Sequence, residues 1–128
     1  MWTGQPIDYE GRHVELHGAI CTPPPARPPR VVVGVGASRR TLQRATSIAD
    51  EVNVYDQPEV IEAAVASARA GGPDVSVFVG WEWDKWPSDV DAELRRIRGH
   101  GIERLFVSLG GADMPERVAQ LARAVAQM

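Results

Sequence analysis

The sequence predicts an α/β fold in which strands and helices alternate along most of the chain. From Val31 onward, a strand-length apolar run is followed by a segment with an apolar stripe at helical spacing, and this unit occurs four times. The runs are rich in valine and nearly continuous in apolar character, which is typical of parallel strands covered on both faces. Four such units form either a small open sheet or half of an eight-stranded barrel, and periodicity alone leaves both open.

Residues 1–30 are expected to form a hairpin and a proline-rich lead-in, followed by a single domain over residues 31–128. Within Ile7–Leu16, the pair Glu10-Gly11 separates two short segments that alternate apolar and polar residues, which indicates a β-hairpin. Thr22–Pro29 contains five prolines, which remove backbone donors and fix φ. This segment is therefore expected to be extended and to lie on the surface.

The four strands and helices of the domain are predicted from their apolar positions. The strands are Val31–Val35, Val52–Tyr55, Val75–Val79 and Leu105–Leu109. The helical stripes that can pack on the sheet are Leu42, Ala45, Ile48 and Ala49; Ile61, Ala64, Val65 and Ala68; Val90, Leu94 and Ile97; and Val118, Leu121, Ala122 and Val125. Capping side chains are expected at Asp56, Ser88 and Asp113, and helix ends at Gly71, Gly72 and Gly99.

Composition and charge restrict the class of protein. The chain has 128 residues, 44% of them hydrophobic, which is enough for one domain with a packed core. A net charge of −3 gives no reason to expect nucleic acid or an anionic membrane as a partner. Cys21 is the one cysteine, so an internal disulfide is impossible and a reducing, cytoplasmic location is expected. The N-terminus lacks the pattern of a signal peptide, and no apolar run is long enough to span a membrane.

An anion-binding loop is predicted where the first strand ends, at the sequence VVVGVGASRR of Val31–Arg40. Free amides at a helix N-terminus and the helix dipole favour phosphate, and Gly34 and Gly36 allow close approach of a ligand. The alternative is that these glycines serve only the turn and that the arginines are solvated. A dinucleotide site is disfavoured, because Arg39 replaces the third glycine of that motif.

Two further groups of residues follow predicted strands and have open interpretations. Gly80–Trp86 reads GWEWDKW, and its tryptophans either stack on a flat ring or fold back over the core. Asn53 and Tyr55 end the second strand and either contact a ligand or pack as ordinary strand-end residues. No catalytic histidine is expected, and the absence of a G-x-S-x-G motif gives no support to a hydrolase.

Several motifs occur in the order found in one enzyme family. The N-terminal pattern W-x-G-x-P with a later glycine and histidine is matched by Trp2, Gly4, Pro6, Gly11 and His13. The following strand, loop and helix pattern is matched by Pro29, Gly34, Gly36, Thr41, Leu42, Ala45, Ala49, Asp50 and Asn53. His100–Val125 is similar to that family's last barrel strand and helix. These stretches resemble the C-terminal half of the bacterial luciferase-like monooxygenases, which are flavin- or deazaflavin-dependent TIM barrels. Val35, Ala37 and Val52 depart from the family pattern.

The resemblance implies a C-terminal (β/α)4 half of a TIM-type barrel, preceded by a β-hairpin, in an oxidoreductase of monooxygenase type. It implies FMN or coenzyme F-420 as the cofactor, with an unidentified small molecule as substrate. The implied cofactor-binding residues are Gly34, Val35, Gly36, Ala37, Ser38, Arg39, Arg40 and Asn53. Because the first half of the barrel has no counterpart in these 128 residues, the alternative is a non-catalytic half-barrel that forms a homodimer or complements a separate N-terminal half.

Overall fold

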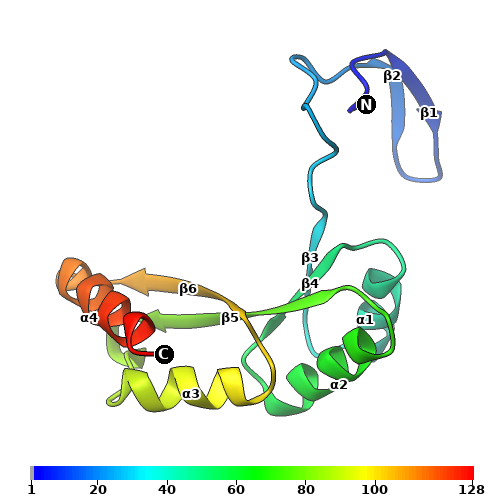
Figure 1. The fold of residues 1–128 in the computed structure, drawn as a ribbon. Coiled ribbons are helices and arrows are strands. Elements are labelled where there is room, and N and C mark those ends of the chain that lie inside the picture. The colour runs from blue at the N-terminus through cyan, green and yellow to red at the C-terminus, as the bar shows by residue number, and fades with distance from the viewer. Residues whose placement is uncertain (1) are drawn as a thin grey trace. The chain divides into compact units, whose positions relative to one another are not determined.

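The computed structural model describes residues 2–128, except for the side chain of Trp83, and divides into two compact units that meet at Arg30 and Val31. The first unit contains an antiparallel hairpin of strands β1 (Ile7–Glu10) and β2 (Glu15–Ala19), shown in Figure 1. The turn is closed by a hydrogen bond in which the Gly11 amide donates to the Val14 carbonyl at 2.9 Å. The predicted hairpin is confirmed, but Glu10 belongs to its first strand and the turn begins at Gly11, and its second strand extends beyond Leu16.

The second unit is a four-stranded parallel sheet whose strands follow one another in sequence order. The strands are β3 (Val32–Val35), β4 (Glu51–Tyr55), β5 (Asp74–Glu82) and β6 (Arg104–Gly110). The helices are α1 (Arg39–Thr46), α2 (Pro58–Arg69), α3 (Val90–Gly99) and α4 (Met114–Ala126), with a short 3-10 helix η1 (Trp83–Lys85) after β5. The predicted alternation of strands and helices around a parallel sheet is confirmed. In the part of the chain that the structure describes, no helix is long and apolar enough to cross a membrane.

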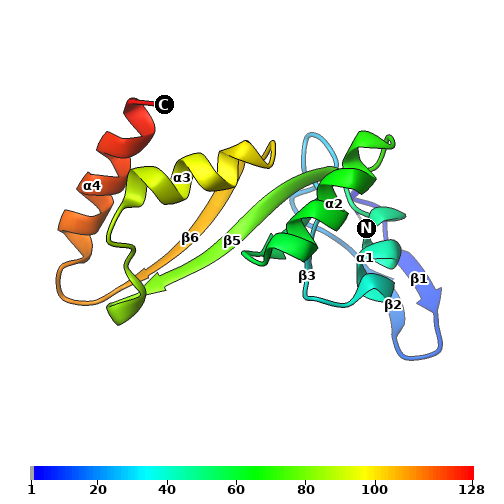
Figure 2. The ribbon, with the colours of Figure 1, turned by 90° about the horizontal axis from the view of Figure 1, so that it is seen from below.

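The helices cover one face of this sheet. Sequential parallel strands joined by right-handed crossovers place every connecting helix on the same side, and Figure 2 shows α1, α2 and α3 in front of the strands. The core between the helices and the sheet is built from alternate strand residues, among them Val35, Val54, Val77 and Trp81. The expectation that both faces are covered was wrong, because the strand order never reverses and so no described helix reaches the other face.

The uncovered face of the sheet, called here the open face, carries the other half of the strand residues. It combines polar and aromatic side chains with glycine, and many of these side chains are exposed or half-buried. In register order its members are Val32, Glu51 and Asp74; Gly34, Asn53, Ser76 and Arg104; Tyr55, Phe78 and Phe106; Gly80 and Ser108; and Glu82 and Gly110.

Four apolar residues predicted to pack on the sheet, Ile48, Val118, Ala122 and Val125, are exposed instead. Helix α1 ends at Thr46, so Ile48 lies beyond it and is 70% exposed. Val118 and Val125 of α4 are 49% and 57% exposed, and Ala124 is the one fully buried residue of this helix. Each of the other helices lies between two consecutive strands, whereas α4 follows β6, the last strand of the sheet among the described residues.

Capping geometry leads to a first prediction, at the start of α3. The Asp89 carboxylate accepts a hydrogen bond from the Ala92 amide at 2.8 Å, so Asp89 and not the predicted Ser88 is the N-cap. We expect Asp89→Ala to lower the free energy of unfolding by about 1 kcal/mol. Ser88→Ala is the matched control and should change it by less than about 0.5 kcal/mol. Urea denaturation followed by circular dichroism measures both, and equal effects would contradict the assignment.

Candidate functional site

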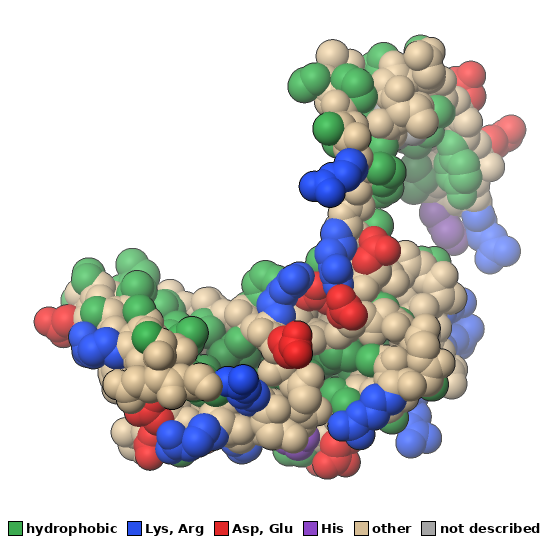
Figure 3. Space-filling model, in the orientation of Figure 1, with side chains coloured by type: hydrophobic (Ala, Val, Ile, Leu, Met, Phe, Trp, Pro, Cys, Tyr) green, Lys and Arg blue, Asp and Glu red, His purple; other side chains and the backbone are tan. Residues whose placement is uncertain are grey.

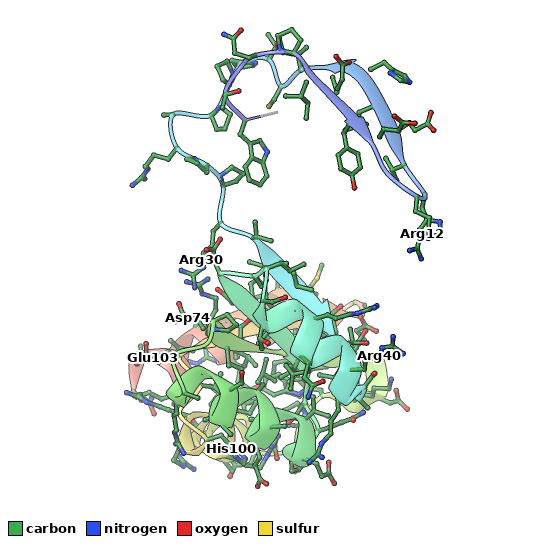
Figure 4. All side chains as sticks on the ribbon, turned by 90° about the vertical axis from the view of Figure 1, so that its right-hand side faces the viewer. Arg12, Arg30, Arg40, Asp74, His100 and Glu103 are labelled. Atoms are coloured by element: carbon green, nitrogen blue, oxygen red, sulfur yellow. The ribbon has the colours of Figure 1, made fainter. Side chains whose placement is uncertain are left out.

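A hollow of about 400 Å³ lies at the carboxyl ends of β3 and β4, on the open face. Ligands of parallel α/β folds bind at this end of the strands. Figure 4 labels Arg40, near the start of α1 at this end, and Asp74 and Glu103, which lie at the opposite end of the sheet. The residues that line the hollow are Gly34, Val35, Gly36, Asn53, Tyr55 and Phe78.

Four of the residues predicted to bind a cofactor therefore lie together. Gly34, Gly36 and Asn53 line the hollow directly, while the side chain of Val35 is buried in the core and only its backbone can border the hollow. Asn53 and Gly34 are far apart in sequence. They lie together because the register of β3 and β4 pairs them.

The two glycines keep the hollow open and are not required by the turn. Neither Gly34 nor Gly36 has a positive φ, and a Cβ at either position would meet no other atom within 4 Å. A side chain is therefore sterically allowed at both positions, and its absence leaves space at the end of β3. This geometry favours close approach of a ligand over the turn-only alternative.

The other predicted residues, Ala37, Ser38, Arg39 and Arg40, form the start of α1. The Ser38 hydroxyl accepts a hydrogen bond from the Thr41 amide at 3.4 Å, and the Ser38 carbonyl accepts one from Leu42 at 3.0 Å. The amides of Arg39 and Arg40 have no acceptor within the helix, as at any helix N-terminus. Both arginine side chains are exposed. Amides and positive charge thus follow directly after the glycines of the hollow.

The side chains on the floor of the hollow can recognise both polar and flat groups. Asn53 Nδ2 donates to the hydroxyl of the buried Ser76 at 2.9 Å, which fixes the orientation of its amide. The rings of Tyr55 and Phe78 pack edge to face, with centroids 5.7 Å apart and an interplanar angle of 87°. Because Tyr55 is exposed, one side of its ring is free to stack on a ligand.

Two polar pairs on the open face were missed by the sequence analysis. The Ser108 hydroxyl donates a hydrogen bond to the Glu82 carboxylate at the carboxyl ends of β5 and β6, the same end of the sheet as the hollow. Arg104 Nη1 donates to Glu51 Oε2 at 2.5 Å at the other end. The partners are 26 and 53 residues apart, so only strand register, which sequence motifs do not reveal, brings them together.

An ion pair on the helix side joins the end of β4 to α3. Arg96 donates to the Asp56 carboxylate at 2.6 Å and to Glu93 at 2.8 Å. The hydrogen bond to Asp56 raises the pKa of Arg96 above its ordinary value, although burial opposes the shift. The carboxylate predicted as a helix cap at Asp56 therefore binds a guanidinium of the next helix instead.

The tryptophan-rich segment packs against the protein itself. Trp81 is buried and contacts Trp86 edge to face, with ring centroids 5.8 Å apart. The Arg117 guanidinium lies 5.3 Å from the centre of the Trp86 ring and donates to the carbonyl of Gly110 at 3.1 Å. For these two tryptophans the structure supports the packing interpretation, and the side chain of Trp83 lies outside the described residues.

No protein-family model matches the sequence, and no solved structure matches this chain. Within residues 2–128, apart from the Trp83 side chain, no group of three or more His, Cys, Asp or Glu residues could hold a metal ion. The fold and the hollow define a mixed α/β unit with a sequentially wound parallel sheet and a recess at the carboxyl ends of its first two strands.

Proposed function

We propose that this chain is the C-terminal (β/α)4 half of a TIM-type barrel of the luciferase-like oxidoreductases, and that it binds FMN or coenzyme F-420 at the hollow. The main support is the sequential parallel order of β3, β4, β5 and β6 with helices on one face, which is the winding of a barrel segment. A doubly wound sheet would reverse its strand order and carry helices on both faces.

The residues of the hollow fit the two ends of such a cofactor. A phosphate group is matched by the amides of Arg39 and Arg40, their guanidinium groups and the space left by Gly36. In the proposed complex, the Asn53 amide, held by its hydrogen bond to Ser76, would orient a flat ring, and the exposed ring of Tyr55 would stack on it. When bound, the cofactor supplies redox chemistry at its ring, and this chain supplies position and charge.

Cofactor titration tests this function. We expect calorimetry to detect binding of FMN or F-420, and Arg39→Ala to weaken it tenfold or more, because a charge-assisted hydrogen bond contributes about 1.5–3 kcal/mol and 1.4 kcal/mol corresponds to tenfold. Gly36→Val should also weaken binding, since its side chain fills the open space beside β3. Arg44→Ala, in the last turn of the same helix, is the matched control and should leave affinity unchanged. Unchanged affinity in Arg39→Ala, or no binding at millimolar cofactor, would refute the proposal.

A second candidate is a non-catalytic half-barrel in the cytoplasm that associates with another half. The exposed apolar stripe of α4 and the uncovered open face favour it, because both are surfaces that a complete barrel encloses. It predicts association without any affinity for FMN or F-420.

A further inference from the structure

Helix α4 lacks the surface that its apolar residues require. A groove of about 750 Å³ lies between α3, α4 and β6, lined mainly by apolar residues such as Leu105, Val107 and Leu121. Figure 3 shows hydrophobic side chains gathered over this part of the second unit. In a β/α barrel each helix packs over its own strand and the following one, so α4 and its exposed Val118 and Val125 need a strand beside β6.

The strand that fits beside β6 is present in the same chain, at the opposite edge of the sheet. Strand β3 is the other terminal strand, and its outer backbone groups have no strand partner among the described residues. It runs parallel to β6, and it directs the half-buried Val33 to the helix side, where α4 needs apolar contacts. The outer edge of β3 therefore matches the free edge of β6 in strand direction and in the side to which the apolar side chains point.

We propose that two copies of this chain close one eight-stranded barrel, with β6 of each copy pairing with β3 of the other. A twofold axis along the barrel keeps all strands parallel and forms both junctions at once, which leaves no free edge. A second copy is favoured over an unrelated partner because this one chain offers both complementary edges and half of the strands of the common barrel. The inference rests on the half-barrel part of the proposed function and is independent of the cofactor.

Closure of the barrel would complete the hollow. Gly34 and Gly36 lie at the β3 edge, so the inner face of the neighbouring β6, including the partner's Phe106 and the partner's Ser108, would border the ligand space. The open face would become the barrel interior, which in eight-stranded barrels is filled by side chains. The pair of Arg104 with Glu51 is compatible with that enclosure, because a buried charge is tolerated when it is paired.

The mass of the full chain in solution, measured without cofactor by sedimentation equilibrium at micromolar concentration, tests this dimer. We expect the mass of two chains. The double variant Val118→Glu/Val125→Glu should sediment as a folded monomer, since both side chains are exposed in one copy and covered in two. Val14→Glu is the matched control, because Val14 is equally exposed, at 55%, but lies in the hairpin turn of the first unit; it should remain dimeric.

Several outcomes overturn the dimer. A monomeric parent chain, a dimeric double variant, or an assembly larger than two chains would each do so, since a closed barrel has no edge for further addition. Hydrogen exchange of the parent chain gives a second readout that needs no variant: amides of β3 and β6 should become slower to exchange as concentration rises, and no change there would refute the pairing. A dimer that binds neither FMN nor F-420 would refute only the cofactor, and a monomer that binds one would refute only the dimer.

Discussion

Replacing Arg104 by methionine is expected to lower the free energy of unfolding by about 2–3 kcal/mol, because it removes the guanidinium that pairs with a buried carboxylate. The Glu51 side chain is 2% exposed and accepts from Arg104 at 2.5 Å, whereas Arg104 is 53% exposed. Because Arg104 is half-exposed, we expect a smaller loss in the free energy of unfolding than the roughly 3–5 kcal/mol found for fully buried pairs. Urea denaturation at one fixed protein concentration measures it, since any self-association adds to apparent stability.

A double-mutant cycle separates the charge from simple packing. Glu51→Gln removes the negative charge and retains the shape, so Arg104→Met should cost less in that background than in the parent chain. Equal costs in the two backgrounds would show that Arg104 stabilises the sheet through its aliphatic stem and not through its charge.

The substitution Ile61→Ala is expected to have the largest effect in the core, with a loss of about 2–5 kcal/mol in the free energy of unfolding. Ile61 lies on α2, is 0% exposed and belongs to the cluster between the helices and the sheet. Its truncation removes buried apolar surface and leaves a cavity that the surrounding valines can fill only in part.

The matched control is Ile48→Ala, which makes the same chemical change at a position that is 70% exposed. We expect an effect within about 0.5 kcal/mol. Both variants are compared by thermal and urea denaturation. A large loss for Ile48→Ala would mean that this residue is covered in solution, and a small loss for Ile61→Ala would contradict the position of the core.

The elements of the second unit were predictable because their signals are local. Short apolar runs marked all the strands, and prolines near Asp56 and Asp113 marked helix starts. Strand length was harder to predict. Strand β5 continues to Glu82, past the predicted end at Val79, because the glycine that follows Val79 weakens the strand pattern without ending the strand. The exposure of Ile48 could not be seen either, because periodicity describes spacing and not where a helix ends.

Strand order and face could not be predicted from periodicity, since they depend on how distant segments meet. The repeated valines were compatible with helices on both faces, and only the sequential order of the sheet decides that one face stays open. The same applies to the site. The glycine loop and Asn53 were found as separate signals, whereas the proximity of Phe78, and the pairing of Glu82 with Ser108, follow from register alone.

The two edge strands of the sheet, β3 and β6, differ, and this difference affects how the protein is handled and stored. Strand β3 is short and follows a segment of prolines, which cannot donate to a growing ladder. Strand β6 is longer, reads RLFVSLG and has one charged residue, at its start. Such a segment resembles the sequences that nucleate cross-β fibrils. We therefore expect insoluble material formed on warming to grow from β6, and Phe106→Lys, a charge at the centre of that strand, to suppress it in a thioflavin assay.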